Sequence, residues 1–238
     1  KVVMEERRLR TDDNPQALAM ERFQTLALPS SPERNPTIGW MRDLDRLTVE
    51  DVRAWYKQWY APANATLIVV GDVTLDQVRS LAGRCFAGLP TPARPRRAAI
   101  RELEPPGERL LTMTLPGQVP SLYLGFNLPG LASAPSPQDA YALQLLAGVL
   151  DGGISARLER NVVRNNQAAA IGSSYNVLAR GDTLLTITAV PAAGQSLTDL
   201  RAAILQSVYA LRDELVSADE LKRVIANVRA QVVYARDD

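Results

Sequence analysis

Apolar residues in the first part of the chain recur mostly at helical spacing. Residues 2–28 interleave apolar and charged side chains, which predicts two helices or one bent helix, because Asp-Asp-Asn-Pro at 12–15 interrupts the pattern. Thr48 precedes an acidic turn and is predicted to cap a helix with Trp55 and Trp59 on its apolar face. A further helix is predicted over residues 74–86.

The remaining pattern indicates strands and more helices. Residues 65–70 form a short apolar, β-branched run that ends at a glycine, which is typical of a buried strand. After residue 108 the predicted strands are 109–115, 121–128, 168–177 and 183–190, and the predicted helices are 137–150, 155–164, 197–215 and 218–236. Ser136 and Ser217 stand at N-cap positions, the latter with Glu220 at the capping-box position.

The order of these elements predicts the fold class. Successive strands joined by short turns pair antiparallel, and helices with one apolar stripe pack on a sheet. We therefore expect an α+β fold, with antiparallel sheets that carry helices on one face. Residues 89–108 are rich in proline and arginine and are predicted to be a linker. Its arginines would suit nucleic acid, but no aromatic residues are interleaved with them, which favours a solvated linker.

The composition of the 238 residues is that of an ordinary globular protein, with 46% hydrophobic and 22% charged residues. The 27 basic and 26 acidic side chains leave a net charge of +1, so we expect no nucleic-acid partner. No apolar run reaches the ~20 residues of a membrane span. The single cysteine, Cys85, excludes an intrachain disulfide, and its apolar neighbours favour a buried, inert thiol over a nucleophile.

The absence of histidine has the largest chemical consequence. The sequence contains none, so the chain supplies no histidine base and no imidazole metal ligand. Histidine-dependent chemistry must be completed by residues outside this sequence. Among the carboxylates, the adjacent Glu5 and Glu6 lie on the first predicted helix, where the simplest interpretation is a solvated charged surface.

The strings around these carboxylates give a more specific hypothesis. VVMEERRLRTDDNP at 2–15 and WYAPANATLIVVGDV at 59–73 resemble segments of the insulinase/pitrilysin family of zinc metallopeptidases, as do the shorter strings IGW at 38–40 and LTVEDV at 47–52. LDGGISARL at 150–158 is similar to the glycine turn and helix that open the family's second, non-catalytic module. An unrelated α+β binding domain would require the match at 59–73 to be accidental.

The resemblance implies a metal site of which this sequence holds one part. In the family, two histidines of an inverted motif and a glutamate on a later helix hold zinc, and the motif's own glutamate is the general base. The matching strings place Glu6 on the third-ligand position and leave Glu5 beside it without a role. The histidines and the base are expected to precede Lys1. The resemblance thus implies no catalytic residue within this chain, zinc in the full-length protein, and none bound to this chain alone.

The resemblance also implies a substrate contact in the second module. An arginine and a following tyrosine often contact substrate there, which places Arg164 on the arginine position and Ile171 on the tyrosine position. Because isoleucine stands where tyrosine is expected, a solvated arginine at a helix end is an equal alternative for Arg164. Tyr175, further along the same predicted strand, is expected to turn its hydroxyl to solvent.

The end of the chain resembles its beginning. Aligning the Asp-Asp pair at 237–238 with that at 12–13 puts Gln231 opposite Glu6, as if the second module had lost the ligand. The resemblance then implies three parts: residues 1–88 are the C-terminal half of a catalytic-type module, 89–108 the linker, and 109–238 the first part of a non-catalytic module. On this interpretation the chain is a fragment.

The leading hypothesis is therefore a fragment of a zinc metalloendopeptidase that hydrolyses peptides and is inactive alone. The rival is a non-catalytic interaction or chamber-forming subunit of the same family, and the residues before Lys1 would discriminate between them. The resemblance implies a peptide or protein substrate and a periplasmic or exported location. Because two half-modules would each leave an apolar surface open, we also expect a homodimer or a partner subunit.

Overall fold

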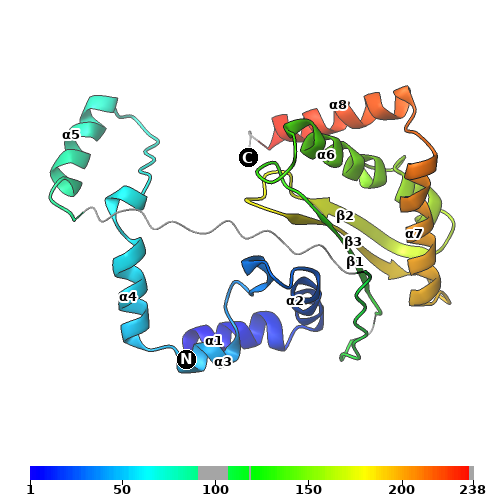
Figure 1. The fold of residues 1–238 in the computed structure, drawn as a ribbon, viewed down its shortest axis with the longest axis horizontal. Helices are drawn as coiled ribbons and strands as arrows, with labels where there is room; N and C mark the ends of the chain where they lie inside the picture. Colours follow the sequence, from blue (N-terminus) through cyan, green and yellow to red (C-terminus); the bar gives the residue numbers. More distant parts are fainter. Residues whose placement is uncertain (91–106, 118, 236–238) are drawn as a thin grey trace. The chain divides into compact units, whose positions relative to one another are not determined.

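The computed structural model describes residues 1–90, 107–117 and 119–235, whose elements are labelled in Figure 1. Two compact units divide them: residues 1–5 and 38–90 form the first, and residues 6–37, 107–117 and 119–235 form the second. Most of the expected linker, residues 91–106, lies outside the described residues. The module boundaries inferred from the resemblance stay a prediction.

The first unit is built from helices α3 (Met41–Arg46), α4 (Val49–Trp59) and α5 (Leu75–Phe86). Thr48 caps α4, and its backbone amide in turn donates to the Asp51 carboxylate, so the predicted start of this helix is confirmed. Thr74 and Gln77 make the same reciprocal pair at the start of α5. The local sequence therefore determines where both helices begin.

Two predicted strands are wrong. Residues 65–70 form no strand, and their side chains are exposed, 79% for Ile68 and 93% for Val70. Residues 109–115 likewise form no strand. A strand is stable only beside a hydrogen-bonding neighbour, and the described residues supply none for either segment. Cys85 is exposed rather than buried, because α5 packs little of its surface within its own unit.

A helical hairpin opens the chain. Helix α1 (Val2–Arg7) leads into a π-helical turn, η1 (Arg8–Asp12), and the chain then reverses into α2 (Pro15–Ala27), followed by the 3-10 turn η2 (Pro32–Arg34). Asn14 caps α2 by accepting a hydrogen bond from the amide of Ala17 at 3.1 Å. The break predicted at 12–15 is confirmed.

A three-stranded antiparallel sheet forms the centre of this unit. Strands β1 (Leu122–Leu128) and β2 (Ala168–Tyr175) both pair with β3 (Thr183–Pro191), in the order β1-β3-β2. Helices α6 (Pro137–Asp151), α7 (Leu197–Asp213) and α8 (Ala218–Tyr234) and the π-helical turn η4 (Glu159–Val163) complete the unit (Figure 1). The predicted α+β class is confirmed. Among the described residues, the structure contains no helix with the length and apolar character of a membrane span.

The core lies on one face of this sheet, between the strands and α6, η4 and α7. Alternate residues of β1 turn toward it, and β3 contributes residues that are almost fully buried. The largest fully buried side chains here are Leu150, Leu158, Val162, Ile187, Leu200 and Ile204. The helices predicted at 137–150, 197–215 and 218–236 are confirmed, with Ser136 and Ser217 as their caps where expected.

Helix α2 contacts the other face of β1. The rings of Phe23 and Tyr123 lie 5.9 Å apart between centroids, and the Asn127 side chain donates to the carbonyl of Ala27 at 2.8 Å. Gly125 allows this approach, because a Cβ there would lie 2.7 Å from the Phe23 ring. The sheet therefore holds the helical hairpin that carries Glu6.

An ion pair joins the segment just before η4 to α8. The Arg157 guanidinium donates to both Glu220 carboxylate oxygens at 3.0 and 2.9 Å, and both side chains are mostly buried. Ser217 caps α8 by accepting from the Glu220 amide, but the Glu220 carboxylate binds Arg157 and so does not complete the predicted capping box. Hydrogen bonding to Arg157 lowers the pKa of Glu220.

Replacing Arg157 by Met should lower the free energy of unfolding by about 3–5 kcal/mol, because it leaves the Glu220 carboxylate buried without its partner. Urea denaturation followed by circular dichroism measures the change. The double variant Arg157→Met/Glu220→Leu should recover much of the loss, since it removes the uncompensated charge. Unchanged stability in Arg157→Met would contradict this assignment.

The same pair should make stability depend on acid pH. The pKa of Glu220 in the folded state is lowered from its usual value of about 4.3, so the ionised pair stabilises fully above that pH and loses its contribution as the pH falls through the folded-state pKa. The stability difference between the native chain and Glu220→Gln should therefore be constant from pH 6 to 8 and shrink from about pH 4.5 downward. Denaturation curves across this range test it, and a difference that is as large at pH 3 as at pH 7 would refute it.

Candidate functional site

Glu6 lies in the last turn of α1 with its carboxylate exposed. The nearest cation is Arg10, one helical turn on, whose Nε lies 3.3 Å from a Glu6 carboxylate oxygen. Both side chains reach solvent, so this pair is weak and open to competition by a stronger ligand. Glu5, the neighbouring carboxylate, is exposed as well.

Arg7, the next residue, turns into the protein. Its guanidinium donates two hydrogen bonds to the Glu21 carboxylate on α2, at 2.9 and 3.0 Å, and lies 3.3 Å from the carboxylate of Asp12. The Arg7 and Glu21 side chains are only 4% and 5% exposed. Hydrogen bonding to Glu21 raises the pKa of Arg7, which keeps the guanidinium charged.

Sequence reasoning missed this buried pair. Arg7 and Glu21 are separated by fourteen residues, and each lies in a stretch rich in charges. One signal was present: Arg7 follows Val3 by four residues, so it continues an apolar stripe of the helix. A charge on an apolar stripe must find a partner when it is buried.

The described residues do not form a zinc site by themselves. No group of three histidine, cysteine, aspartate or glutamate side chains in this part of the chain could hold a metal ion. Glu6 has suitable chemistry for one ligand, since zinc accepts carboxylate oxygens, but catalytic zinc needs three protein ligands. Glu6 thus offers the chemistry of one zinc ligand, and the described residues bring no second and third ligand beside it.

Arg164, the predicted substrate contact, directly follows the π-helical turn η4. Its side chain is half-exposed, donates to the carbonyl of Ile154, and lies 4.0 Å from the Glu159 carboxylate. No hydrogen bond or ion pair joins Arg164 to Glu6. Arg164 thus interacts with residues close to it in the sequence, and the structure does not bring it together with Glu6.

The two residues considered alongside Arg164 both serve the fold. Ile171, on the expected tyrosine position, packs against the core of the sheet. Tyr175 was expected to reach solvent, and this is wrong: its hydroxyl donates to the carbonyl of Pro129 at 2.6 Å, and its ring packs on the core. Burial raises the pKa of Tyr175, so it stays a neutral hydrogen-bond donor.

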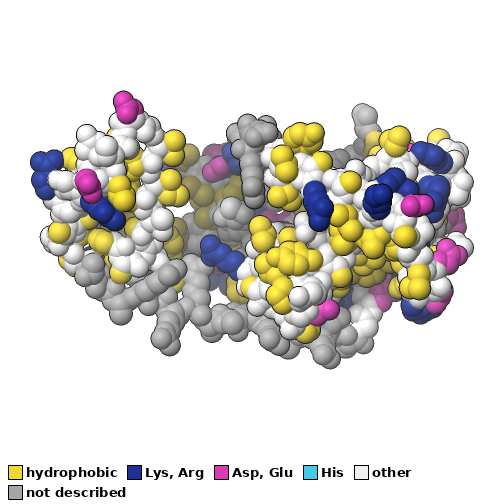
Figure 2. Space-filling view, turned by 90° about the horizontal axis from the view of Figure 1, so that it is seen from above, with side chains coloured by type: hydrophobic (Ala, Val, Ile, Leu, Met, Phe, Trp, Pro, Cys, Tyr) yellow, Lys and Arg dark blue, Asp and Glu magenta, His cyan; other side chains and the backbone are white. Residues whose placement is uncertain are grey.

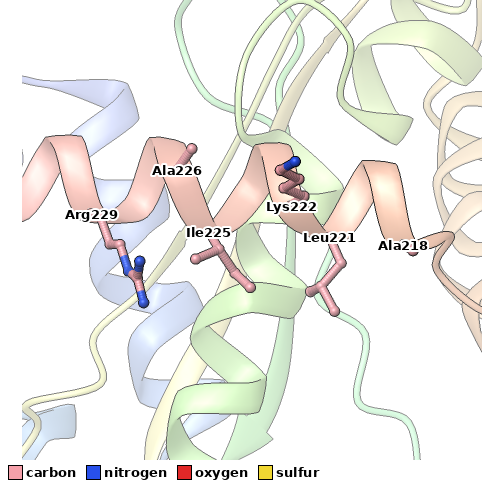
Figure 3. A pocket seen from close by; sticks show the side chains of 6 residues that line it. All are labelled: Ala218, Leu221, Lys222, Ile225, Ala226 and Arg229. Carbon is pink, nitrogen blue, oxygen red and sulfur yellow. The ribbon is translucent and has the colours of Figure 1, made fainter.

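Two shallow cavities lie away from these residues. One, of about 430 Å³, follows α8, where Leu221, Ile225 and Arg229 project from the same side of the helix (Figure 3). The other, of about 490 Å³, lies in the first unit and is lined by side chains that include Trp55, Tyr60 and Phe86. Neither cavity includes Glu6 or Arg164, so neither belongs to the predicted site. Gln231, the predicted counterpart of Glu6, is exposed near the end of α8.

Comparison with known proteins gives the family. The sequence profile described as the Peptidase M16 inactive domain matches residues 46–228. The zinc protease PqqE of Helicobacter pylori is 26% identical over 241 residues, which cover 98% of this chain and 52% of that protein. The chain spans about half the length of the curated relatives it matches.

Solved structures share the fold. The crystal structure of a protease from Helicobacter pylori matches with a TM-score of 0.84 and 26% identity, over 98% of this chain and 56% of that one. A chain of complex III2 from Candida albicans matches with a TM-score of 0.76 at 15% identity, over 98% of this chain and 55% of that one, and therefore shows the fold alone.

These matches confirm the resemblance found in the strings at 2–15 and 59–73. The profile covers well over half of the chain, including both the helix capped by Thr48 and the sheet of the second unit. The chain belongs to the M16 peptidase family and contains a domain of its inactive type.

Proposed function

We propose that this chain is part of a zinc-dependent peptidase, to which Glu6 supplies one metal ligand and residues 109–238 the first part of a non-catalytic module. The observation that carries the proposal is that the carboxylate of Glu6, which the resemblance places on the third-ligand position, is exposed at the end of a helix anchored by the buried Arg7–Glu21 pair. The relatives named zinc proteases support the reaction class.

The chain alone should hydrolyse no peptide. Zinc in such a site supplies a Lewis acid that activates water. The remaining ligands and the general base must come from residues that this chain lacks, because it contains no histidine. A protein or peptide substrate, and zinc in the longer protein, belong to the same proposal.

Replacing Glu6 by Gln in the longer protein should lower zinc affinity by more than about 100-fold, since even outer-shell partners of metal ligands contribute roughly 10–100-fold. Peptide hydrolysis should fall with it. Metal content after dialysis and turnover of a quenched-fluorescence peptide measure the two effects. Glu5→Gln is the matched control and should leave both unchanged. The reverse result, with Glu5 essential and Glu6 dispensable, would mean that the assignment is wrong by one residue.

A second candidate is a non-catalytic interaction or chamber-forming subunit of the same family. It is favoured by the match to the inactive-domain profile. Zinc content of the longer protein discriminates between the two candidates. A metal-free, inactive protein that co-purifies with a catalytic partner would support the subunit.

We further propose that this chain, taken alone, forms a homodimer through its first unit. Large apolar side chains are exposed along residues 65–70 and on α4, and Figure 2 shows hydrophobic side chains reaching the surface. The backbone at 65–70, which belongs to no helix or strand, also carries amide and carbonyl groups that a strand of a second copy would pair with. Exchange between two identical chains would cover both at low cost.

Light scattering across the micromolar range should show a dimer. Val70→Lys, at a 93% exposed position of the segment 65–70, should weaken dimerisation about 10-fold or more, because it places a charge in the proposed contact. Ile154→Lys changes an apolar residue of the second unit that is 81% exposed, and it should have no effect. A compact monomer of the native chain at every concentration would eliminate the dimer.

A further inference from the structure

We propose that Arg7 is a positioning residue, whose buried ion pair with Glu21 sets the rotation of α1 so that the carboxylate of Glu6 stays on its exposed side. This inference rests on the proposed role of Glu6 as a zinc ligand. The proposed zinc site does not itself involve the Arg7–Glu21 pair. The inference gives this pair the function of orienting Glu6.

Helix geometry couples the two side chains. Successive residues of an α-helix are rotated by about 100° around the axis, because a turn contains 3.6 residues. Fixing the direction of Arg7 therefore fixes that of Glu6. Two parallel hydrogen bonds between a planar guanidinium and a carboxylate define an orientation, which a single contact does not.

The anchor itself is fixed to the sheet. Glu21 lies on α2, and α2 is held on β1 by the Phe23–Tyr123 ring contact and by the hydrogen bond from Asn127 to Ala27. Arg7 also lies 3.3 Å from Asp12, at the end of the π-helical turn. One guanidinium thus ties together the end of α1, the end of η1 and the middle of α2.

The π-helical turn explains why such an anchor is needed. Directly after Arg7 the helix widens, with the amide of Asp13 bonded to the carbonyl of Arg8 at 2.8 Å in place of the usual four-residue spacing. π-Helical turns are rare, and they occur frequently at functional sites. Because the regular α-helical hydrogen-bond pattern does not continue past Arg7, the buried ion pair of Arg7 holds the end of α1, and with it the direction of the Glu6 side chain.

Energetics also favour positioning over stability. A buried ion pair gains little net free energy over apolar residues of the same size, because both charges lose their hydration. The chain contains a second pair of the same geometry, Arg157–Glu220, which lies on other elements and makes no contact with Glu6. That pair provides a control with similar burial and the same chemistry.

The test compares Arg7→Met with Arg157→Met in the longer, zinc-binding protein. Both should lose stability, but only Arg7→Met should lose zinc affinity, by roughly 10–100-fold as found for residues that orient metal ligands. Competition with a chelator measures the affinity at a temperature at which circular dichroism shows all variants folded. The absorption spectrum of the cobalt-substituted protein reports ligand geometry, and it should change in Arg7→Met alone. Arg7→Lys, which keeps the charge without the two-pronged contact, should recover part of the affinity.

The outcomes distinguish failure of this inference from failure of the proposed function. If Arg7→Met keeps native zinc affinity and the native cobalt spectrum while Glu6→Gln loses zinc, Arg7 does not position the ligand and the inference is overturned, but the proposed function stands. If the native protein binds no zinc, the proposed function fails and this inference fails with it. Should Arg7→Met not fold, Glu21→Gln keeps the shape of the partner, and its zinc affinity decides the question in the same direction.

Discussion

The hydrogen-bonding requirement of β-strands decides what this chain builds. Strand β3 has a partner on each side, and its alternate residues are buried under α6 and α7, so the second unit has a continuous core. Residues 65–70 are as apolar as β3, but no strand lies beside them and they remain exposed. Apolar composition alone is therefore insufficient, because an extended segment also needs a partner for its backbone.

Two buried arginine–glutamate ion pairs fix helices of the second unit relative to neighbouring segments. Arg157–Glu220 connects the segment before η4 to α8, and Arg7–Glu21 connects α1 to α2. Each uses both carboxylate oxygens, so each specifies an angle as well as a distance. The surface pairs, such as Glu6–Arg10, leave their side chains free to exchange partners.

Features coded by neighbouring residues could be predicted from the sequence. Thr48, Ser136 and Ser217 cap their helices as expected, because a cap depends on only a few positions. Strand 121–128 and the pair at 168–177 and 183–190 followed from their apolar alternation and were found with small changes at their ends. The family was visible in long strings whose match needs no three-dimensional information.

Features that depend on distant residues could not be predicted. The partner of Arg7 is fourteen residues away, and the role of the Tyr175 hydroxyl depends on a carbonyl 46 residues away. The predictions of strands at 65–70 and 109–115 were wrong for the same reason. Both segments have the residue pattern of a strand, but the described residues contain no strand that pairs with either. The metal site could be predicted only in part, because the single carboxylate of Glu6 does not define a site that needs three protein ligands.

The packing of α2 on β1 has a consequence for how the protein folds. The hydrogen bond from Asn127 to Ala27 spans 100 residues, so the helical hairpin that carries Glu6 is anchored late, after a large loop has closed. During synthesis the hairpin leaves the ribosome well before the strand that holds it, because the chain grows from its N-terminus. In the interval, Phe23 faces water and its hairpin lacks its sheet.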